Sequence, residues 1–332
     1  MFTRLTLSNF TVFEALDIEF SKGINVFVGA NGTGKTHLLK LLYCLQDCYV
    51  PNRSPLAEKL GTVFRPRDND FRRLCRRRRG RTATDITVET DKKNIHAHWH
   101  SGSGRLTQTP SSPFLDELPI YIPVKEVLSF APGFISLYDK YEMAFDEVYY
   151  DILKLAYLPV RKGRPSEESG DILEKIRQLI GGQVVTEGDV FFLRNHENAN
   201  LEMHLVAEGY RKLALLWQLI HNGSLLVETT LFWDEPEANL NPSLMQHVVN
   251  ILIMLANRGV QVFLATHNFA FLKELDLQKQ QTLVTYFAFD DSGQGVTAHS
   301  CSSYATITPN KIAEEYLRLY DQEMEQAFKG GH

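Results

Sequence analysis

The chain has 332 residues, of which 44% are hydrophobic and 23% are charged, as is typical of a globular protein with a large core. Its 35 Lys and Arg residues against 40 Asp and Glu residues give a formal net charge of -5, which excludes a uniformly basic surface. No stretch reaches the roughly 18 apolar residues that span a bilayer, and the first residues lack a secretory signal pattern. We therefore expect a cytoplasmic protein that does not contact a membrane.

In the first half of the chain we predict strands, then a helix, then a small sheet. Residues 3–7 and 16–20 alternate apolar and polar side chains, and residues 24–28 form a short apolar run. A helix should follow from Thr36, where leucines recur at helical spacing. The region around residues 60–100 is interpreted as a small antiparallel sheet.

Helices and buried strands alternate in the second half. The spacing predicts helices over 133–158, 171–180, 208–221 and 242–257, and apolar strands over 231–233 and 260–265. This order indicates an α/β fold. The tail should form a helix capped by Asn310, with an apolar face that packs on something. That face comprises Ile312, Tyr316, Leu319, Tyr320 and Met324.

The strongest motif is GANGTGKT at residues 29–36, which matches GxxxxGK[ST] between a predicted strand and helix. Its glycines let backbone N–H groups surround phosphate oxygens, Lys35 reaches the outer phosphates, and the Thr36 hydroxyl binds Mg²⁺. The predicted nucleotide-binding residues are Asn31, Gly32, Thr33, Gly34, Lys35 and Thr36.

Two further motifs follow buried strands. In LFWDEPEANLNP the apolar run ends at Asp234, a candidate Mg²⁺ ligand, and Glu235, a candidate base for water. In FLATHNF the strand ends at His267, which is placed to hydrogen-bond the γ-phosphate or to orient the water.

Together these motifs resemble the ABC-type ATPase superfamily, in particular the RecF/SMC-like branch of bacterial AAA family ATPases found in DNA maintenance and anti-phage systems. The opening LTLSNFTVFEALDIEFSKGINVFVGANGTGKT is similar to that branch as well. The resemblance implies an α/β P-loop ATPase head of the ABC/RecF type, with an antiparallel β lobe and a short helical insertion. It also implies ATP and Mg²⁺ as cofactors, Glu235 as catalytic base and His267 as switch histidine.

We predict one split ATPase domain over residues 1–332. Its parts are an N-terminal lobe with the phosphate-binding loop at 1–122, a helical arm at 123–182, a half with the signature, the Asp234 strand and the switch histidine at 183–308, and a C-terminal helix at 309–332.

The resemblance places the trans signature contact at Ala207, Glu208 and Gly209, and the D-loop at 238–241, including Asn241. The segment departs from LSGGQ, because Ala207 replaces a serine hydroxyl and Glu208 replaces a glycine. Arg211 or Lys212 could supply compensating charge, although solvated side chains are the interpretation we favour.

The glutamine-bearing loop of the family has no clear equivalent in this chain. Residues 121–126 lie at about the right place, and Lys125 or Glu126 could sense the nucleotide. A simple surface turn is an equal alternative.

Residues 65–81 contain nine arginines and two aspartates, which gives a local charge of 9 − 2 = +7. This arginine segment either grips a phosphodiester backbone or serves as a solvated loop, an internal charge partner or a docking surface for an acidic protein. Phe71 and Leu74 could anchor it to the core. The patch is predicted to comprise Arg72, Arg73, Arg76, Arg77, Arg78, Arg79 and Arg81.

Three functions are compatible with these motifs. The first is an ATPase that dimerises around ATP, as a homodimer or a larger homo-oligomer of dimers, and gates a separate effector, a nuclease or toxin, in anti-phage defence. The second is a DNA-binding ATPase in replication or repair. The third, the ATP-binding subunit of a transporter, is disfavoured by the weak signature.

Overall fold

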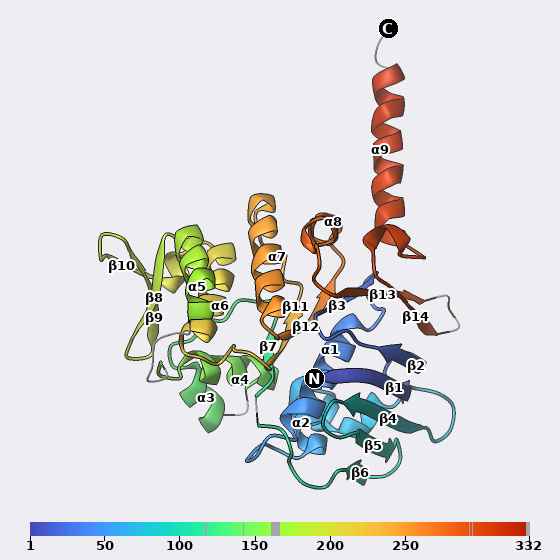
Figure 1. Cartoon of the computed structure of the whole chain (residues 1–332). Coiled ribbons are helices and arrows are strands. Elements are labelled where there is room, and N and C mark those ends of the chain that lie inside the picture. The colour runs from blue at the N-terminus through green and yellow to red at the C-terminus, as the bar shows by residue number, and fades with distance from the viewer. Residues whose placement is uncertain (117, 142, 161–166, 292, 294, 330–332) are drawn as a thin grey trace.

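A six-stranded sheet lies at the centre of the computed structural model, which describes residues 1–332 except 117, 142, 161–166, 292, 294 and 330–332 (Figure 1). Its middle strands, β3 (Ile24–Gly29), β12 (Gln261–Thr266) and β11 (Thr230–Asp234), are parallel neighbours and are buried almost throughout. Strands covered on both faces read as continuous apolar runs, as these do. The sheet is completed by β7 (Ile120–Ile122), β13 (Val284–Asp291) and β14 (Val296–Cys301).

The two faces of this sheet belong to two hydrophobic cores. Along β3, Val26 and Val28 contribute to one core, whereas the alternate residue Phe27 contributes to the other. The first core contains residues of α6 (Glu208–His221), α7 (Pro242–Asn257) and α8 (Phe269–Gln278). The second contains α1 (Lys35–Asp47) and the β lobe. The predicted α/β class is confirmed.

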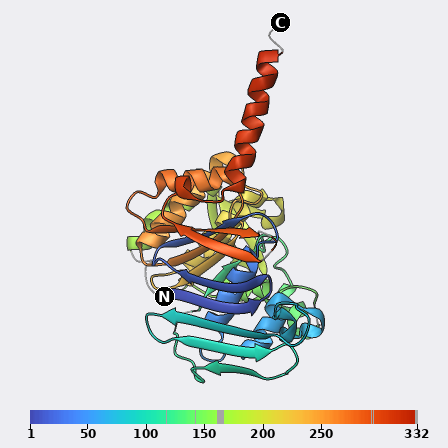
Figure 2. The same ribbon diagram turned by 90° about the vertical axis from the view of Figure 1, so that its right-hand side faces the viewer.

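The β lobe is a five-stranded antiparallel sheet in the order β2-β1-β4-β5-β6 (Figure 2). Its strands are β1 (Phe2–Phe10), β2 (Phe13–Glu19), β4 (Ala83–Thr90), β5 (Ile95–His100) and β6 (Leu106–Thr109). The predicted sheet around 60–100 is wrong at its start, where α2 (Leu56–Phe64) is helical. Leu56, Leu60 and Val63 recur at helical spacing and bury one face of α2.

Three helices and a small sheet occupy the region between the two motif-bearing halves. The expected helix over 133–158 is two helices, α3 (Phe134–Lys140) and α4 (Glu147–Ala156), because Tyr141 and Asp146 adopt extended backbone conformations. Phe134 of α3 and Ile152 of α4 lie in the first core, so both helices pack against the body. The remaining elements here are α5 (Glu167–Ile180), β8 (Gly182–Glu187), β9 (Val190–Asn195) and β10 (Asn200–Glu202).

Four short 3₁₀ helices complete the described secondary structure. They are η1 (Arg67–Asn69), η2 (Phe71–Leu74), η3 (Met203–Leu205) and η4 (Tyr304–Thr306). None of the helices in the described part of the chain combines the length and apolarity needed to cross a bilayer.

A buried ion cluster joins α1, α2 and α4. The Lys59 ammonium, whose side chain is 1% exposed, lies 2.5 Å from Asp151, 3.1 Å from Asp47 and 3.2 Å from Glu147. Arg53 pairs with Asp47 at 2.5 Å and with Asp151 at 3.1 Å. Burial alone would lower the pKa of Lys59, but the carboxylates reverse this effect and raise the pKa above its ordinary value.

The C-terminal helix α9 (Lys311–Lys329) projects from the body (Figures 1 and 2). Asn310 caps it as predicted, because its side-chain oxygen accepts a hydrogen bond from the Ala313 amide at 3.0 Å. Ile312 and Ala313 pack against the first core, whereas Tyr320 and Met324 are exposed. The expectation that the apolar face packs is thus met within the chain only at the base of α9.

Candidate ATPase site at the strand ends

The phosphate-binding loop connects β3 to α1, which begins at Lys35. Gly32 and Gly34 have φ values of 85° and 88°, in the left-handed region that favours glycine. A Cβ atom at Gly34 would lie 2.6 Å from the Val12 side chain, so the loop is also closely covered by the β1–β2 turn. The Lys35 ammonium donates to the carbonyls of Gly29 and Ala30, both at 2.8 Å.

Thr36 and Asp234 meet at the edge of the sheet. The Thr36 hydroxyl donates to Asp234 Oδ1 at 3.1 Å, and the Tyr121 hydroxyl approaches Asp234 Oδ2 at 3.4 Å. Burial raises the pKa of Asp234 to about 6. A hydroxyl and a buried carboxylate are oxygen donors of the kind that Mg²⁺ prefers, and a bound cation would offset the cost of burying this charge. The residues therefore fit the implied metal.

Glu235 and His267 form the next pair along this edge. Nδ1 of His267 lies 3.1 Å from Oε1 of Glu235, and the backbone amide of Glu235 donates to the Ala265 carbonyl at 2.9 Å. Glu235 has φ 47°, a left-handed conformation that is strained for a side chain of this kind. Both side chains remain partly exposed, at 29% and 46%, so water can reach them.

A third carboxylate of the same motif, Glu237, was missed by the sequence analysis. It is 5% exposed and accepts a hydrogen bond from the Thr266 hydroxyl at 2.5 Å. Burial raises its pKa above the ordinary value. The contact ties the loop after β11 to the end of β12, directly before His267.

The predicted signature segment opens α6 and contacts the predicted D-loop of the same chain. The Asn239 amide donates to Glu208 Oε1 at 2.8 Å, and a Cβ at Gly209 would lie 3.1 Å from the Leu240 side chain. Ala207 is the N-cap of α6 and provides no side-chain cap. Asn241, in turn, caps α7 by accepting from the Ser243 amide at 3.1 Å.

Lys212 is not the solvated side chain that we favoured. It is 1% exposed, and its ammonium donates to the carbonyls of Ala238 at 2.7 Å and Glu235 at 3.4 Å. Burial lowers its pKa. The signal was available, because Lys212 lies at helical spacing from Leu216 and Leu219 on the apolar face of α6.

Arg211 and Glu126 connect the start of α6 to the segment after β7. Nε of Arg211 lies 3.2 Å from Glu126 Oε1, and both side chains are largely buried. Glu126 also accepts from the Ser129 amide at 3.2 Å. The surface-turn alternative therefore holds for the exposed Lys125 but not for Glu126.

Three arginines of the arginine segment make contacts within the chain that hold it in place. Arg72 pairs with Asp70 at 2.7 Å, Arg76 donates to the Val12 carbonyl, and Arg78 pairs with Glu14. Leu74 is buried and Phe71 packs against Trp99, so the predicted anchors are confirmed.

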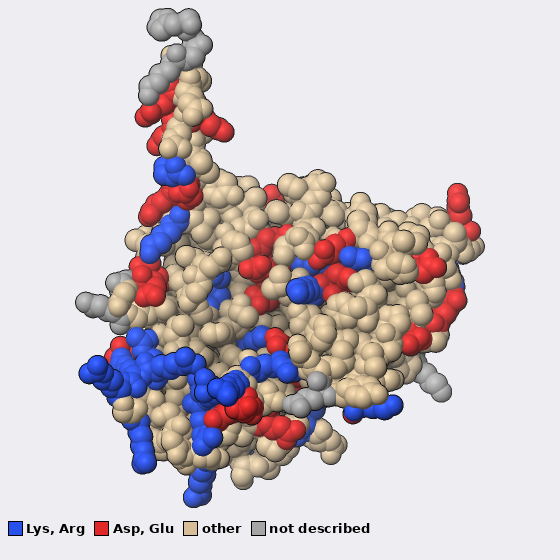
Figure 3. Space-filling model, turned by 180° about the vertical axis from the view of Figure 1, so that it is seen from behind, with Lys and Arg blue, Asp and Glu red and all other residues tan. Residues whose placement is uncertain are grey.

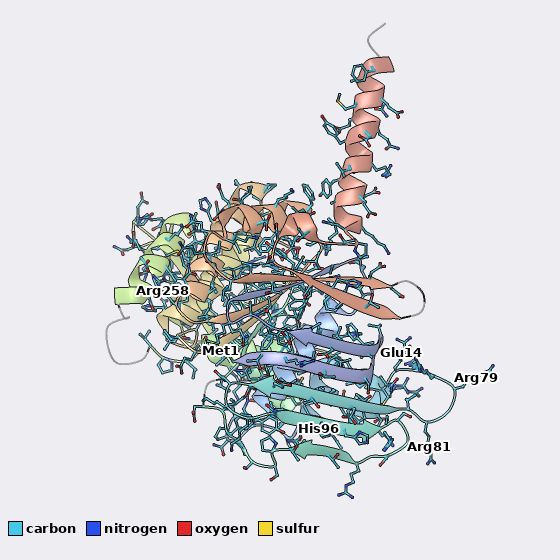
Figure 4. All side chains as sticks on the ribbon, turned by 45° about the vertical axis from the view of Figure 1, so that its right-hand side comes forward. Met1, Glu14, Arg79, Arg81, His96 and Arg258 are labelled. Atoms are coloured by element: carbon cyan, nitrogen blue, oxygen red, sulfur yellow. The ribbon has the colours of Figure 1, made fainter. Side chains whose placement is uncertain are left out.

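The remaining arginines of the predicted patch are exposed. They are Arg73, Arg77, Arg79 and Arg81. The segment surrounds a hollow of about 390 Å³, and basic side chains gather on this part of the surface (Figure 3). Arg79 and Arg81 lie at the same edge of the β lobe as Glu14 (Figure 4).

Two family profiles match the chain. The one described as "AAA domain, putative AbiEii toxin, Type IV TA system" matches residues 89–273, which is more than half of the chain. A second, described as "AAA domain", matches residues 4–109.

The curated relatives match this chain over only part of its length. The DNA replication and repair protein RecF of Streptococcus suis is 31% identical over 134 residues, which is 40% of this chain and 33% of that protein. RecF of Cytophaga hutchinsonii is 50% identical over 42 residues, 13% of this chain and 11% of that protein. The chain thus spans about a third of the length of the first curated relatives it matches.

Solved structures match over nearly the whole chain. The Smc head bound to the C-winged helix domain of ScpA has a TM-score of 0.59 at 12% identity, with 92% of this chain and 98% of that chain covered. The Smc head with an extended coiled coil bound to the C-terminal domain of ScpA, derived from Pyrococcus furiosus, has a TM-score of 0.56 at 13% identity, with 97% and 99% covered. This likeness confirms the predicted ABC/RecF-type P-loop fold.

Proposed function

We propose that this chain, which belongs to the AAA-domain family whose profile covers residues 89–273 and is of the RecF/SMC-like ATPase type, binds ATP with Mg²⁺ and hydrolyses it. The observation that carries the proposal is the meeting of Thr36 with Asp234 at 3.1 Å, beside the Glu235–His267 pair at 3.1 Å. A phosphate loop, a metal-binding carboxylate and a base for water are the parts that nucleotide hydrolysis requires.

Each residue has a distinct role in this proposal. Lys35 exchanges its two loop carbonyls for the outer phosphate oxygens of ATP, and Thr36 and Asp234 hold Mg²⁺. The metal, when bound, neutralises the phosphate charge. Glu235 accepts a proton from the attacking water, and His267 positions Glu235 and that water from the neighbouring strand end.

The signature segment of a second copy closes over the γ-phosphate in this proposal. Because Ala207 has no hydroxyl, the donors are the backbone N–H groups at the start of α6. The links from Glu208 to Asn239 and from Lys212 to Ala238 make the signature and the D-loop one unit, so closure by a partner acts directly on the loop that carries Glu235.

We further propose that ATP-dependent closure gates a separate effector, a nuclease or toxin, in anti-phage defence. The support is the family description, which names a toxin of a type IV toxin–antitoxin system. A second candidate function is a DNA-binding ATPase in replication or repair. The exposed arginines and the RecF relatives favour it.

The test compares phosphate release from ATP by the wild type and by Glu235→Gln, each with and without duplex DNA at low and moderate salt. We expect turnover only in the wild type, whereas Glu235→Gln should retain ATP and gain molar mass on ATP addition in light scattering. Salt-sensitive acceleration by DNA would favour the second candidate. An inactive wild type would refute the ATPase proposal.

A further inference from the structure

Helix α9 exposes an unusual amount of apolar surface. Leu317 is 62% exposed, Tyr320 58% and Phe328 76%, and the helix stands clear of the body in both ribbon views (Figures 1 and 2). Its 19 residues extend about 28 Å. Exposed apolar side chains that gather in one place, rather than singly, mark an interaction surface.

The base of α9 forms one wall of an apolar groove. The groove has a volume of about 700 Å³ and is lined by Phe269 and Lys273 of α8, Tyr304 of η4 and residues 313–323 of α9. Tyr316 stacks on Phe269 with a ring separation of 4.4 Å. The groove therefore lies beside the proximal half of α9, whereas Met324 and Phe328 lie on its distal half.

The spacing of the apolar residues on α9 specifies what covers them. Ala313, Leu317, Tyr320, Met324 and Ala327 are separated by four, three, four and three residues. This is the heptad seam by which one helix packs along another, with side chains of each inserting between those of its partner. The occupant is accordingly a helix.

We propose that the occupant is α9 of a second copy of this chain, packed antiparallel and centred near Tyr320. This orientation brings Met324 and Phe328 of each copy to the proximal groove of the other, so one patch serves both subunits, as a twofold interface requires. A parallel pair would leave both grooves unfilled.

Charge favours the same orientation. By sequence, the distal half of α9 has a net charge of 1 − 3 = -2, whereas two acidic and two basic residues balance in the proximal half, which also faces Lys273 in the groove. Antiparallel packing places the acidic half of each helix beside the neutral half and the Lys273 groove of the other, whereas parallel packing would place the two acidic halves side by side.

The base of α9 also touches the ATPase site. Gly29 and Ala30 of the phosphate-binding loop line a small cleft with Pro309, Lys311 and Ile312. Phe269, on which Tyr316 stacks, follows His267 by two residues. Pairing through α9 needs no nucleotide, yet its anchor lies where ATP binding is proposed. Together with the ATP-dependent contact, it would build assemblies larger than a dimer.

The first experiment measures molar mass by light scattering at micromolar concentration without nucleotide. The wild type should be a dimer. The double variant Met324→Glu and Phe328→Glu should weaken association by tenfold or more, about 1.4 kcal/mol, because it buries charge in the seam and against the partner's groove. The matched control, Gln322→Glu and Gln326→Glu, adds the same charge outside the seam and should remain a dimer.

Either of two results would overturn the proposal. One is a monomeric wild type, which would assign α9 to a different chain, and the other is a double variant that associates like the wild type. Circular dichroism verifies that the variants fold. Phosphate release by the double variant is measured separately, so a failure of the ATPase proposal does not obscure the outcome for α9.

Cysteine cross-linking tests the orientation. In a Cys301→Ser background, a copy with Ala313→Cys is mixed with a differently tagged copy that has Ala327→Cys. Antiparallel pairing predicts a disulfide between the two different copies. Cross-links confined to like copies would indicate parallel pairing and contradict the proposed arrangement.

Discussion

Two charged regions of this molecule use their charges in opposite ways. In the buried ion cluster, Lys59 and Arg53 each contact at least two carboxylates within 3.2 Å, and the Lys59 side chain is 1% exposed. In the arginine segment, Arg76 contacts the β1–β2 turn and Arg78 pairs with Glu14 of β2, while Arg79 is exposed. The first region is complete within the chain, and the second presents charge to the surroundings.

The difference teaches that the number of charges in a segment says little about their use. Nine arginines within 17 residues are conspicuous in the sequence, whereas the ion cluster draws its members from α1, α2, α4 and the loop before α2. A buried ion must be paired, because desolvation costs several kcal/mol. An exposed ion is solvated, so replacing it with another residue changes the free energy of unfolding only slightly.

The largest effect on stability should come from Lys59→Met. The substitution leaves Asp47 and Asp151 buried without their ammonium partner, which typically costs about 3–5 kcal/mol. Urea unfolding at neutral pH measures the loss. Lys22→Met, at an exposed position, is the control and should change the free energy of unfolding by less than about 0.5 kcal/mol. Equal losses in both variants would break the comparison.

Asp234→Asn should stabilise the protein at neutral pH when Mg²⁺ is removed with a chelator. The folded pKa of Asp234 is about 6, above the ordinary 3.8. The protonated carboxyl therefore contributes its full share to the free energy of unfolding below pH 3.8, and this contribution is lost as the pH rises through about 6. The asparagine cannot ionise, so we expect a gain of up to about 3 kcal/mol near pH 8.

Urea unfolding at pH 5 and pH 8 tests this prediction. The difference between the two pH values should shrink in Asp234→Asn and persist in Asp116→Asn, whose side chain is 85% exposed. An unchanged pH dependence in Asp234→Asn would show that this carboxyl is not held in an unfavourable ionised state.

Lys212→Met should uncouple the signature helix from the D-loop. It removes the donor to the Ala238 and Glu235 carbonyls, and leaving buried acceptors unsatisfied costs about 1–3 kcal/mol. Because the affected loop carries Glu235, kcat should fall while the ATP dissociation constant stays close to the wild-type value. Normal kcat in a destabilised Lys212→Met protein would limit Lys212 to a structural role.

The smallest effect on stability should come from replacing the exposed arginines with serine, at positions Arg73, Arg77, Arg79 and Arg81. Their removal should change the free energy of unfolding by no more than about 0.5 kcal/mol. If the segment binds duplex DNA, affinity should fall and the slope of log K against log salt should decrease by about 3–4. Fluorescence anisotropy measures both quantities, and Arg105→Ser is the control. An unchanged slope would exclude these arginines as phosphate contacts.

The elements that local pattern defines were predicted well. The helices at 208–221 and 242–257 have the predicted bounds, since an amphipathic or apolar face recurs every turn and Pro242 marks the start of the second. The error at α2 concerns its last five residues, 60–64, which lie in the region interpreted as strands. The break at Tyr141 has no glycine or proline to announce it.

The chain order alone determined that a phosphate loop, two carboxylates and a histidine all follow buried strands, because parallel strands end at one edge of their sheet. Only the tertiary structure decided which groups join them. Tyr121 reaches Asp234, and Lys212 reaches Ala238, across distances of 113 and 26 residues in the sequence. Such contacts depend on how separate elements pack, and no local spacing encodes them. The same holds for α9. Its amphipathic pattern can be recognised in the sequence, but only the folded structure shows that no other part of the described chain covers its distal half.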